Sequence, residues 1–281
     1  MPPESAWKRL GGEGACLVFT HANGFPPETY ATLLRALVPH FQVATFAARP
    51  LWSTDDPKGL QSWHPLAADL EEAIESHDQF PVVAVGHSLG GMLCALASAD
   101  RPDLFSALVL LDPVVFTGVQ SFGWGWMKRL GMEQRFHLVR GALRRRDAWP
   151  DRAAARASWS GKTAFEHWDP GVFEDYLKCG LVTRPDGTVA LRYPKRWEAR
   201  IFEVCPHDEW SILRRISVPV LVIRGETSDT LLPNAAQRMS RELPDARVVD
   251  LEGTSHFLPM EKPGEIARMI VDFAREDADK T

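Results

Sequence analysis

The sequence has few of the features that mark metal-binding, membrane-spanning or nucleic-acid-binding proteins. Its four cysteines are scattered without C-x-x-C spacing, so we expect reduced structural thiols rather than disulfides or a zinc site. No apolar run is long enough to cross a bilayer. The formal net charge of −5 gives no basic field to attract phosphates. We therefore expect no metal, no cofactor, no membrane span and no nucleic-acid partner, and the oligomeric state stays open. The cysteines are Cys16, Cys94, Cys179 and Cys205.

The N-terminus also lacks a targeting signal. Residues 1–5 read Met-Pro-Pro-Glu-Ser, with neither a basic region nor a following apolar one, so the cytoplasm is the expected location. A chain of 281 residues that is 45% hydrophobic and 25% charged can bury a large core in one domain with an insertion.

Short apolar runs alternate with segments of helical periodicity. The helical segments are 27–38, 66–74, 90–99, 235–243 and 263–273. Strands that are apolar on both faces and alternate with helices form a parallel sheet covered on both sides. The sequence therefore predicts a doubly wound α/β fold with a mostly parallel sheet. The predicted strands are 17–20, 42–46, 81–85, 107–111, 218–223 and 247–251.

The alternation breaks between Asp112 and Val218, which are farther apart than one crossover helix requires. We expect a mainly helical cap at 116–205, with the core formed by 1–115 and 206–281. The basic run 144–146 is interpreted as a solvated helix face. The break holds seven of the ten tryptophans, of which most should pack inside the cap and the rest should line a substrate pocket. They are Trp124, Trp126, Trp149, Trp159, Trp168, Trp197 and Trp210.

The segment Gly86-His87-Ser88-Leu89-Gly90 lies between a buried strand and a helix of small residues. A serine hydroxyl is a poor nucleophile near neutral pH and needs both a base and an unobstructed position. Glycines on either side allow the tight strand-to-helix turn that supplies this position. The pattern predicts a nucleophile elbow with Ser88 at its apex.

The base and the acid should follow the nucleophile in the order acid, then histidine. His256 is the one histidine among nine that follows the last predicted strand, so it is the predicted base. Two aspartates end or follow a strand, Asp112 and Asp229. We favour Asp229, because Asp112 beside a proline could serve only to organise a turn. Glu226 is expected to be exposed to solvent or to brace its loop.

An acyl transfer also needs two N–H donors for the oxyanion. Leu89 follows the nucleophile at the start of a helix and supplies the first. The loop after the first predicted strand should supply the second, from Phe25 as first choice or from Asn23 or Ala22 as alternatives. His21 is expected to brace this loop.

These motifs resemble those of the capped α/β-hydrolase superfamily, in serine esterase-like form. The likeness rests on His21-Ala22-Asn23-Gly24-Phe25-Pro26, on the elbow, on 225–229 and on 253–256, and it covers nearly the whole chain outside the cap. It implies an eight-stranded sheet with the cap inserted after the sixth strand. Only residues 7–10 precede the first strand as further strand material, so the usual opening hairpin is shortened or absent.

The nucleophile narrows the chemistry that the resemblance implies. Related epoxide hydrolases and haloalkane dehalogenases place an aspartate at the elbow, whereas Ser88 would form an acyl-enzyme. We expect a carboxylesterase acting on a small ester with an apolar acyl or alcohol part. A lipase, thioesterase, lactonase, perhydrolase or carbon–carbon bond hydrolase would use the same scaffold. The non-enzymatic alternative is a protein of this fold that binds a small ligand without turning it over.

Overall fold

The computed structural model describes residues 1–78, 80–207 and 209–278. Its centre is a seven-stranded sheet in the order β1-β3-β2-β4-β5-β9-β10, in which β1 is antiparallel to β3 and the other pairs are parallel. This is the predicted α/β-hydrolase architecture. The strands are β1 (Trp7–Gly11), β2 (Cys16–Thr20), β3 (Gln42–Phe46), β4 (Val82–His87), β5 (Phe105–Leu111), β9 (Val220–Gly225) and β10 (Ala246–Leu251).

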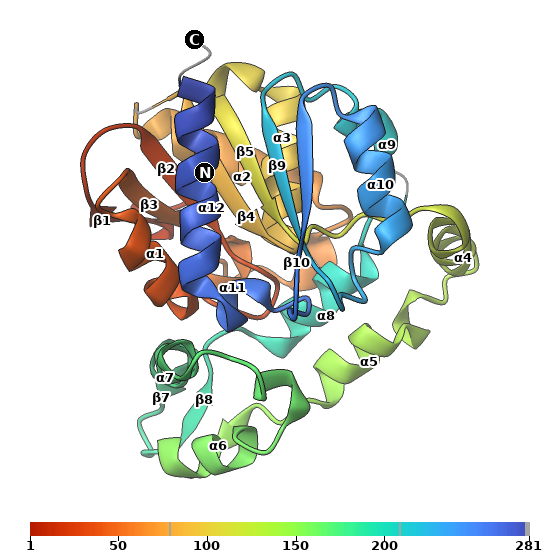
Figure 1. The fold of residues 1–281 in the computed structure, drawn as a ribbon. Coiled ribbons are helices and arrows are strands. Elements are labelled where there is room, and N and C mark those ends of the chain that lie inside the picture. Colours follow the sequence, from red (N-terminus) through yellow and green to blue (C-terminus); the bar gives the residue numbers. More distant parts are fainter. Residues whose placement is uncertain (79, 208, 279–281) are drawn as a thin grey trace.

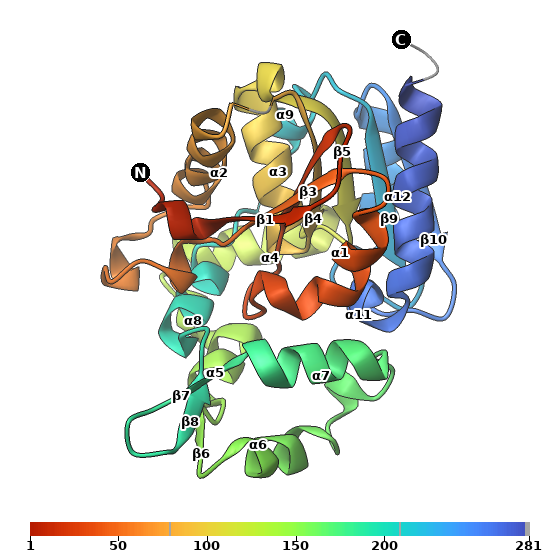
Figure 2. The ribbon, with the colours of Figure 1, turned by 90° about the vertical axis from the view of Figure 1, so that its left-hand side faces the viewer.

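Helices cover both faces of the sheet because its strands are apolar on both sides. Leu17 and Phe19 of β2 pack with α1 and α12 on one face, whereas Val18 packs with α2 and α3 on the other. Figures 1 and 2 show this three-layered core. The core helices are α1 (Ala31–Leu37), α2 (His64–Ser76), α3 (Leu89–Asp100), α9 (Trp210–Leu213), α10 (Pro233–Glu242), α11 (Leu258–Glu261) and α12 (Pro263–Ala278).

The chain leaves the core after β5 and returns to it before β9. We call the elements between these two points the cap. Most of them lie beneath the core in both views, whereas the first helix, α4, lies at its side in Figure 1 (Figures 1 and 2). They include a small antiparallel sheet in the order β6-β8-β7, which the helical pattern did not predict. The cap elements are α4 (Gly118–Arg129), α5 (His137–Arg144), β6 (Ala148–Trp149), α6 (Arg152–Trp159), α7 (Pro170–Cys179), β7 (Leu181–Thr183), β8 (Val189–Leu191) and α8 (Lys195–Glu203).

The strand count differs from the one that the resemblance implies. The sheet has seven strands in the described residues, and the cap follows the fifth strand of the chain rather than the sixth. The reason lies at the N-terminus, where β1 pairs directly with β3. Only one strand precedes β2, which is the shortened opening that residues 7–10 suggested.

No helix in the described part of the chain combines the length and the apolar character needed to cross a membrane.

Candidate active site

Ser88 lies at the turn between β4 and α3, with backbone angles φ 55° and ψ −113°. Non-glycine residues rarely adopt positive φ, and such strain is found where a side chain must be presented to a substrate. The turn also needs both neighbouring glycines. A Cβ on Gly86 would lie 2.4 Å from the Gly90 carbonyl group, and one on Gly90 would lie 2.1 Å from the Thr20 carbonyl oxygen. The elbow therefore has the geometry that its sequence predicts.

Two hydrogen bonds connect Ser88 to a histidine and an aspartate. His256 lies in the loop between β10 and α11, and its Nε2 is 3.0 Å from Ser88 Oγ. Its Nδ1 is 2.6 Å from Oδ2 of Asp112. Asp112 is fully buried, and the His256 side chain is 18% exposed. A serine, a histidine and a buried carboxylate in this order form the arrangement that activates a serine hydroxyl.

Asp112, and not Asp229, is the carboxylate that contacts His256, so the expectation for the acid is wrong. Asp112 follows β5, the strand between β4 and β9, and its carboxylate points into the site. It accepts hydrogen bonds from Gly225 N–H at 3.0 Å and from Ser228 Oγ at 2.5 Å, in addition to the histidine. In the loop after β9, the inward side chain belongs to Ser228, and Asp229 is exposed. Glu226 accepts from Gly253 N–H and braces its loop, as expected.

His87 connects the elbow to both neighbouring loops, a role that the sequence analysis missed. Its Nε2 is 2.9 Å from the carbonyl oxygen of His256, so Nε2–H donates there. Its Nδ1 then accepts from the Tyr30 hydroxyl at 2.8 Å, and Tyr30 in turn accepts from Ala22 N–H at 3.2 Å. Burial holds the pKa of His87 well below its usual value, so the ring stays neutral and this pattern of donors is fixed.

His21 braces the loop that follows β2, as predicted. Ala48 N–H donates to its Nε2 at 2.9 Å, so the proton is on Nδ1, which donates to Ala22 O at 2.8 Å. The ring is fully buried, and burial lowers its pKa to about 4. A neutral imidazole therefore fixes the start of this loop.

The backbone donors of the same loop are not equally available. Phe25 N–H donates to Ala22 O at 3.3 Å, and Ala22 N–H is taken by Tyr30. This disfavours our first choice, Phe25. Asn23 N–H has no such bond within the described residues. Leu89 N–H lies at the start of α3, next to Ser88.

The side chain of Asn23 connects this loop to the cap. Its Nδ2 donates to the Glu198 carbonyl oxygen of α8 at 3.0 Å, and its Oδ1 accepts from the Tyr193 hydroxyl at 3.0 Å. Asn23 and Tyr193 are both buried. Gly24 allows the loop to approach α8 closely, because a Cβ at this position would lie 3.3 Å from the Glu198 carboxylate. The position of the loop therefore depends on the position of α8.

An ion pair across the cap joins α8 to the segment after α5. Arg145 Nη2 lies 2.6 Å from Glu198 Oε2. Burial raises the pKa of Glu198, and the charge of Arg145 partly offsets that effect. Arg144 and Arg146 are exposed, as expected for a solvated face, whereas Arg145 is half-buried and paired.

Most of the seven tryptophans between Asp112 and Val218 pack inside the protein, and one of them contacts aromatic rings next to the site. Six of the seven are at most 6% exposed, the exception being Trp126 at 47%. The Trp168 ring lies 5.7 Å from that of Phe25 and 5.8 Å from that of Phe257, which neighbours His256. Tyr176 of α7 also contacts Phe25, at 5.3 Å. We call the rings of Phe25, Trp168, Tyr176 and Phe257 the aromatic roof; they lie beside the loops that follow β2 and β10.

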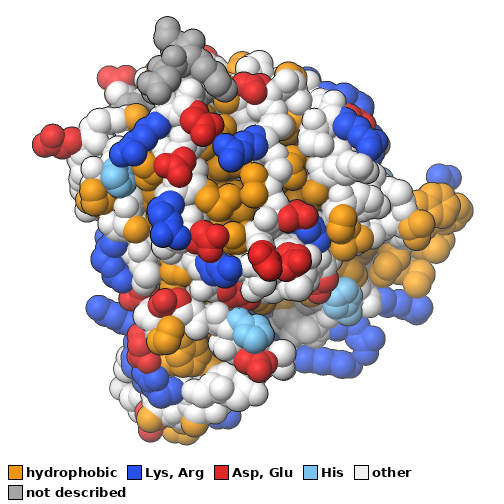
Figure 3. Space-filling view, viewed as in Figure 1, with side chains coloured by type: hydrophobic (Ala, Val, Ile, Leu, Met, Phe, Trp, Pro, Cys, Tyr) orange, Lys and Arg blue, Asp and Glu red, His pale blue; other side chains and the backbone are white. Residues whose placement is uncertain are grey.

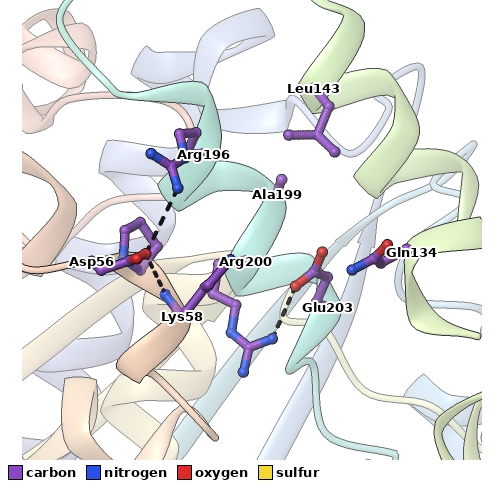
Figure 4. Close-up of a pocket in the computed structure, with 9 residues that line it drawn as sticks. Asp56, Lys58, Gln134, Leu143, Arg196, Ala199, Arg200 and Glu203 are labelled. Carbon is purple, nitrogen blue, oxygen red and sulfur yellow. Dashed lines mark hydrogen bonds and ion pairs between the residues drawn. The ribbon is translucent and has the colours of Figure 1, made fainter. Parts of the chain in front are cut away.

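A separate hollow of about 380 Å³ lies on the outer side of α8 (Figure 4). None of Ser88, Asp112 and His256 lines it. Two ion pairs lie at its wall, Arg200 with Glu203 at 2.9 Å and Arg196 with Asp56 at 3.8 Å. The hollow is therefore separate from Ser88, His256 and Asp112.

This chain belongs to the alpha/beta hydrolase family, whose sequence model matches residues 17–269. It is 29% identical to the abhydrolase domain-containing protein AFT2-1 of Alternaria alternata over 235 residues, which are 71% of this chain and 85% of that protein. It is 31% identical to the lipase LipV of Mycobacterium tuberculosis over 213 residues, which are 72% of this chain and 71% of that protein.

Two further likenesses are narrower or more distant. The type I acyl-CoA thioesterase mpaH' of Penicillium brevicompactum is 30% identical over 154 residues, 49% of this chain and 34% of that protein. The crystal structure of E-2-(acetamidomethylene)succinate hydrolase superposes with a TM-score of 0.78 at 22% identity, covering 96% of this chain and 94% of that one. At this identity the structural likeness supports the fold.

Proposed function

We propose that this protein is a serine hydrolase that cleaves carboxylic esters through an acyl-enzyme on Ser88. The observation that carries the proposal is the continuous series Ser88, His256, Asp112, with contacts of 3.0 Å and 2.6 Å. When Nδ1–H of His256 donates to Asp112, the lone pair on Nε2 faces the serine hydroxyl. That tautomer makes the histidine a base for this serine.

The reaction follows from these positions. Ser88 Oγ attacks the ester carbonyl carbon while its proton moves to His256 Nε2, and the carbonyl oxygen becomes an oxyanion. The tetrahedral intermediate collapses, the bond to the alcohol oxygen breaks, and His256 returns its proton to the departing alcohol. Water then repeats these steps on the acyl-enzyme and releases the acid. Asp112 stabilises the imidazolium that forms in each half-reaction.

Leu89 and Asn23 are the proposed N–H donors to the oxyanion. Leu89 N–H is at the helix start directly after the nucleophile, where backbone donors favour negative charge. Asn23 replaces Phe25 in this role because the N–H groups of Phe25 and Ala22 are already bonded. Each such donor contributes about 2.7–4 kcal/mol to lowering the barrier.

The aromatic roof supports a substrate with an apolar part. Phe25, Trp168 and Phe257 place ring surfaces close to the histidine of the triad. Aromatic side chains contribute large apolar contact areas, and ligand pockets are lined mainly by such groups. We therefore propose that the acyl or alcohol part of the ester is apolar or aromatic.

The test is the hydrolysis of p-nitrophenyl esters of increasing acyl length by the wild type and by Ser88→Ala. We expect the variant to lose at least about 1000-fold in kcat, and a fluorophosphonate probe to label the wild type only. Ser255→Ala is the matched control, because Ser255 lies beside His256 but bonds to Glu261. Full activity in Ser88→Ala would refute the mechanism. Absence of labelling in folded wild type would favour a ligand-binding protein.

A thioesterase is the second candidate, because one relative is an acyl-CoA thioesterase at 30% identity over 154 residues. The same triad can attack a thioester, so only the substrate distinguishes the two. Acyl-CoA thioesters should be assayed beside the p-nitrophenyl esters of the same chain length. A kcat/KM that is higher for the thioesters throughout the series would assign the thioesterase instead.

A further inference from the structure

Helix α4 carries an apolar face that is open to solvent. Val119 is 87% exposed, Phe122 68%, Trp126 47% and Leu130 61%. Their spacing of three to four residues places them on one side of the helix. Figure 3 shows the resulting apolar area at the side of the molecule where α4 projects from the core. A cluster of large exposed apolar side chains of this kind marks a binding surface.

The opposite side of α4 is anchored, so this orientation is fixed. Trp124 is buried, and its Nε1–H donates to the Cys205 carbonyl oxygen at 2.8 Å. Lys128 donates to the same oxygen at 3.0 Å. Ser121 Oγ donates to the His207 carbonyl oxygen at 2.5 Å. Rotating the helix to bury its apolar face would break all three bonds.

The charge of this region is opposite to that of the whole chain. Residues 118–146 contain seven Lys and Arg against one acidic residue, a formal charge of +6 in a chain of −5. Five exposed arginines here have no ion pair with a carboxylate in the described part of the chain. Arg146 lies over the Trp149 ring, and the other four are Arg129, Arg135, Arg140 and Arg144. Two further exposed apolar residues, Leu138 and Leu143, lie among them on or beside α5.

We propose that this α4–α5 surface binds the face of an anionic lipid bilayer, with α4 lying along the interface. Helices that lie in this way combine aromatic and aliphatic residues on one side with basic residues around them. Phe122 and Trp126 enter the headgroup region, where amphipathic aromatic rings are favoured. The four arginines are attracted to the negative surface potential of anionic lipids.

The positive charge of the α4–α5 surface also argues against a second copy of the chain as its binding partner. In a two-fold dimer the same patch appears on both sides of the interface. Two regions of formal charge +6 would then face each other, and like charges across an interface disfavour association. An anionic surface has the complementary charge.

The experiment is co-sedimentation of the full chain with vesicles. One set is phosphatidylcholine alone, and the other contains about one third phosphatidylglycerol. We expect binding to the anionic vesicles only, and its loss at about 0.5 M NaCl because salt screens the attraction. The double variant Phe122→Ser/Trp126→Ser should bind at least about tenfold more weakly. Leu10→Ser/Val182→Ser is the matched control, since it removes two exposed apolar side chains elsewhere and should bind like the wild type.

A second pair of variants tests the charge. Arg140→Glu/Arg144→Glu changes the net charge by the same amount as Arg9→Glu/Arg241→Glu, which alters exposed arginines outside this surface. Only the first pair should reduce vesicle binding by about tenfold or more. Circular dichroism confirms that each variant is folded.

Three results would overturn the proposal. The first is wild-type protein that stays in solution with anionic vesicles. The second is equal loss of binding in a variant pair and its control. The third is a concentration-dependent dimer that Phe122→Ser/Trp126→Ser abolishes, observed without vesicle binding, which would assign this surface to self-association.

Discussion

Replacing Asp112 by asparagine removes a charge from the centre of the candidate site while changing its volume very little. The carboxylate accepts three hydrogen bonds, from Gly225 N–H, from the Ser228 hydroxyl and from His256 Nδ1. An asparagine side chain offers one acceptor oxygen and one NH₂ donor group in the same place. At least one of the three bonds must therefore be lost or reversed.

If the asparagine oxygen keeps its hydrogen bond with Gly225 N–H, the hydrogen bond to His256 is the one whose direction must reverse. The amide NH₂ then faces His256 Nδ1, which must accept, so the imidazole proton moves to Nε2. In that tautomer Nε2–H points at Ser88 Oγ and cannot accept its proton. Loss of the correct tautomer in a serine triad lowers kcat roughly 10,000-fold. We expect a loss of that order in Asp112→Asn, with little change in KM.

Asp229→Asn is the matched control, because it makes the same chemical change on an exposed side chain in the loop after β9. It should leave kcat within about twofold of the wild type. The assay is p-nitrophenyl ester hydrolysis, with circular dichroism to establish that both variants are folded. A folded Asp112→Asn with near-normal kcat, or a larger loss in Asp229→Asn, would refute the assignment.

Three other perturbations test other parts of the structure. Tyr193→Phe removes the hydrogen bond to Asn23 and should lower kcat about tenfold by releasing the loop after β2. Trp63→Phe removes a different bond between the core and the cap and should lower only stability, by about 1 kcal/mol. Equal kcat losses in the two variants would contradict this. His21 has its pKa lowered from 6.5 to about 4, so the unfolded chain binds its proton first, and urea unfolding should show about 3 kcal/mol of stability lost as the pH falls through that window. Buried His87 also causes a loss of stability in acid, so replacing His21 by Asn should remove only the His21 part of the pH dependence. An unchanged dependence would argue against this role of His21. Gly90→Ala places a Cβ 2.1 Å from the Thr20 carbonyl oxygen and should cost about 3 kcal/mol in thermal unfolding, so a neutral effect would show that the elbow is looser than described.

The nucleophile and the histidine could be predicted because their signals are local. Ser88 is defined by glycines within two residues, and His256 by the strand just before it. Predicting the acid instead requires knowing which of two strand ends, that of β5 or that of β9, brings its aspartate to His256. Which side chain points inward after β9 is decided by one residue, and Ser228 rather than Asp229 takes that direction. Periodicity does not resolve a loop at that level.

The second oxyanion donor was also beyond sequence reasoning. The choice depends on hydrogen bonds that occupy two of the candidate N–H groups, that of Ala22 with Tyr30 and that of Phe25 with the Ala22 carbonyl oxygen. It also depends on contacts of Asn23 with cap residues that are 170 or more positions away. A histidine inside the elbow was a usable signal, because His87 is flanked by glycine and serine in a fully buried strand end. The mostly parallel sheet covered by helices followed from the alternation of strands and helices. The small cap sheet did not, because it is built from two- and three-residue strands without a clear period.

The position of Asp112 limits where the chain can be joined if the cap is exchanged for that of a relative. Asp112 directly follows β5, shortly before the chain enters the cap at α4, and the residues just after it are also held in place. Val115 is buried, and the Phe116 carbonyl oxygen accepts from Trp210 Nε1–H at 2.8 Å. A chimera joined at the end of β5 would alter the backbone that aims the carboxylate at His256. The junction should therefore be placed after Phe116, so that the backbone that positions Asp112 against His256 keeps its native sequence in the chimera.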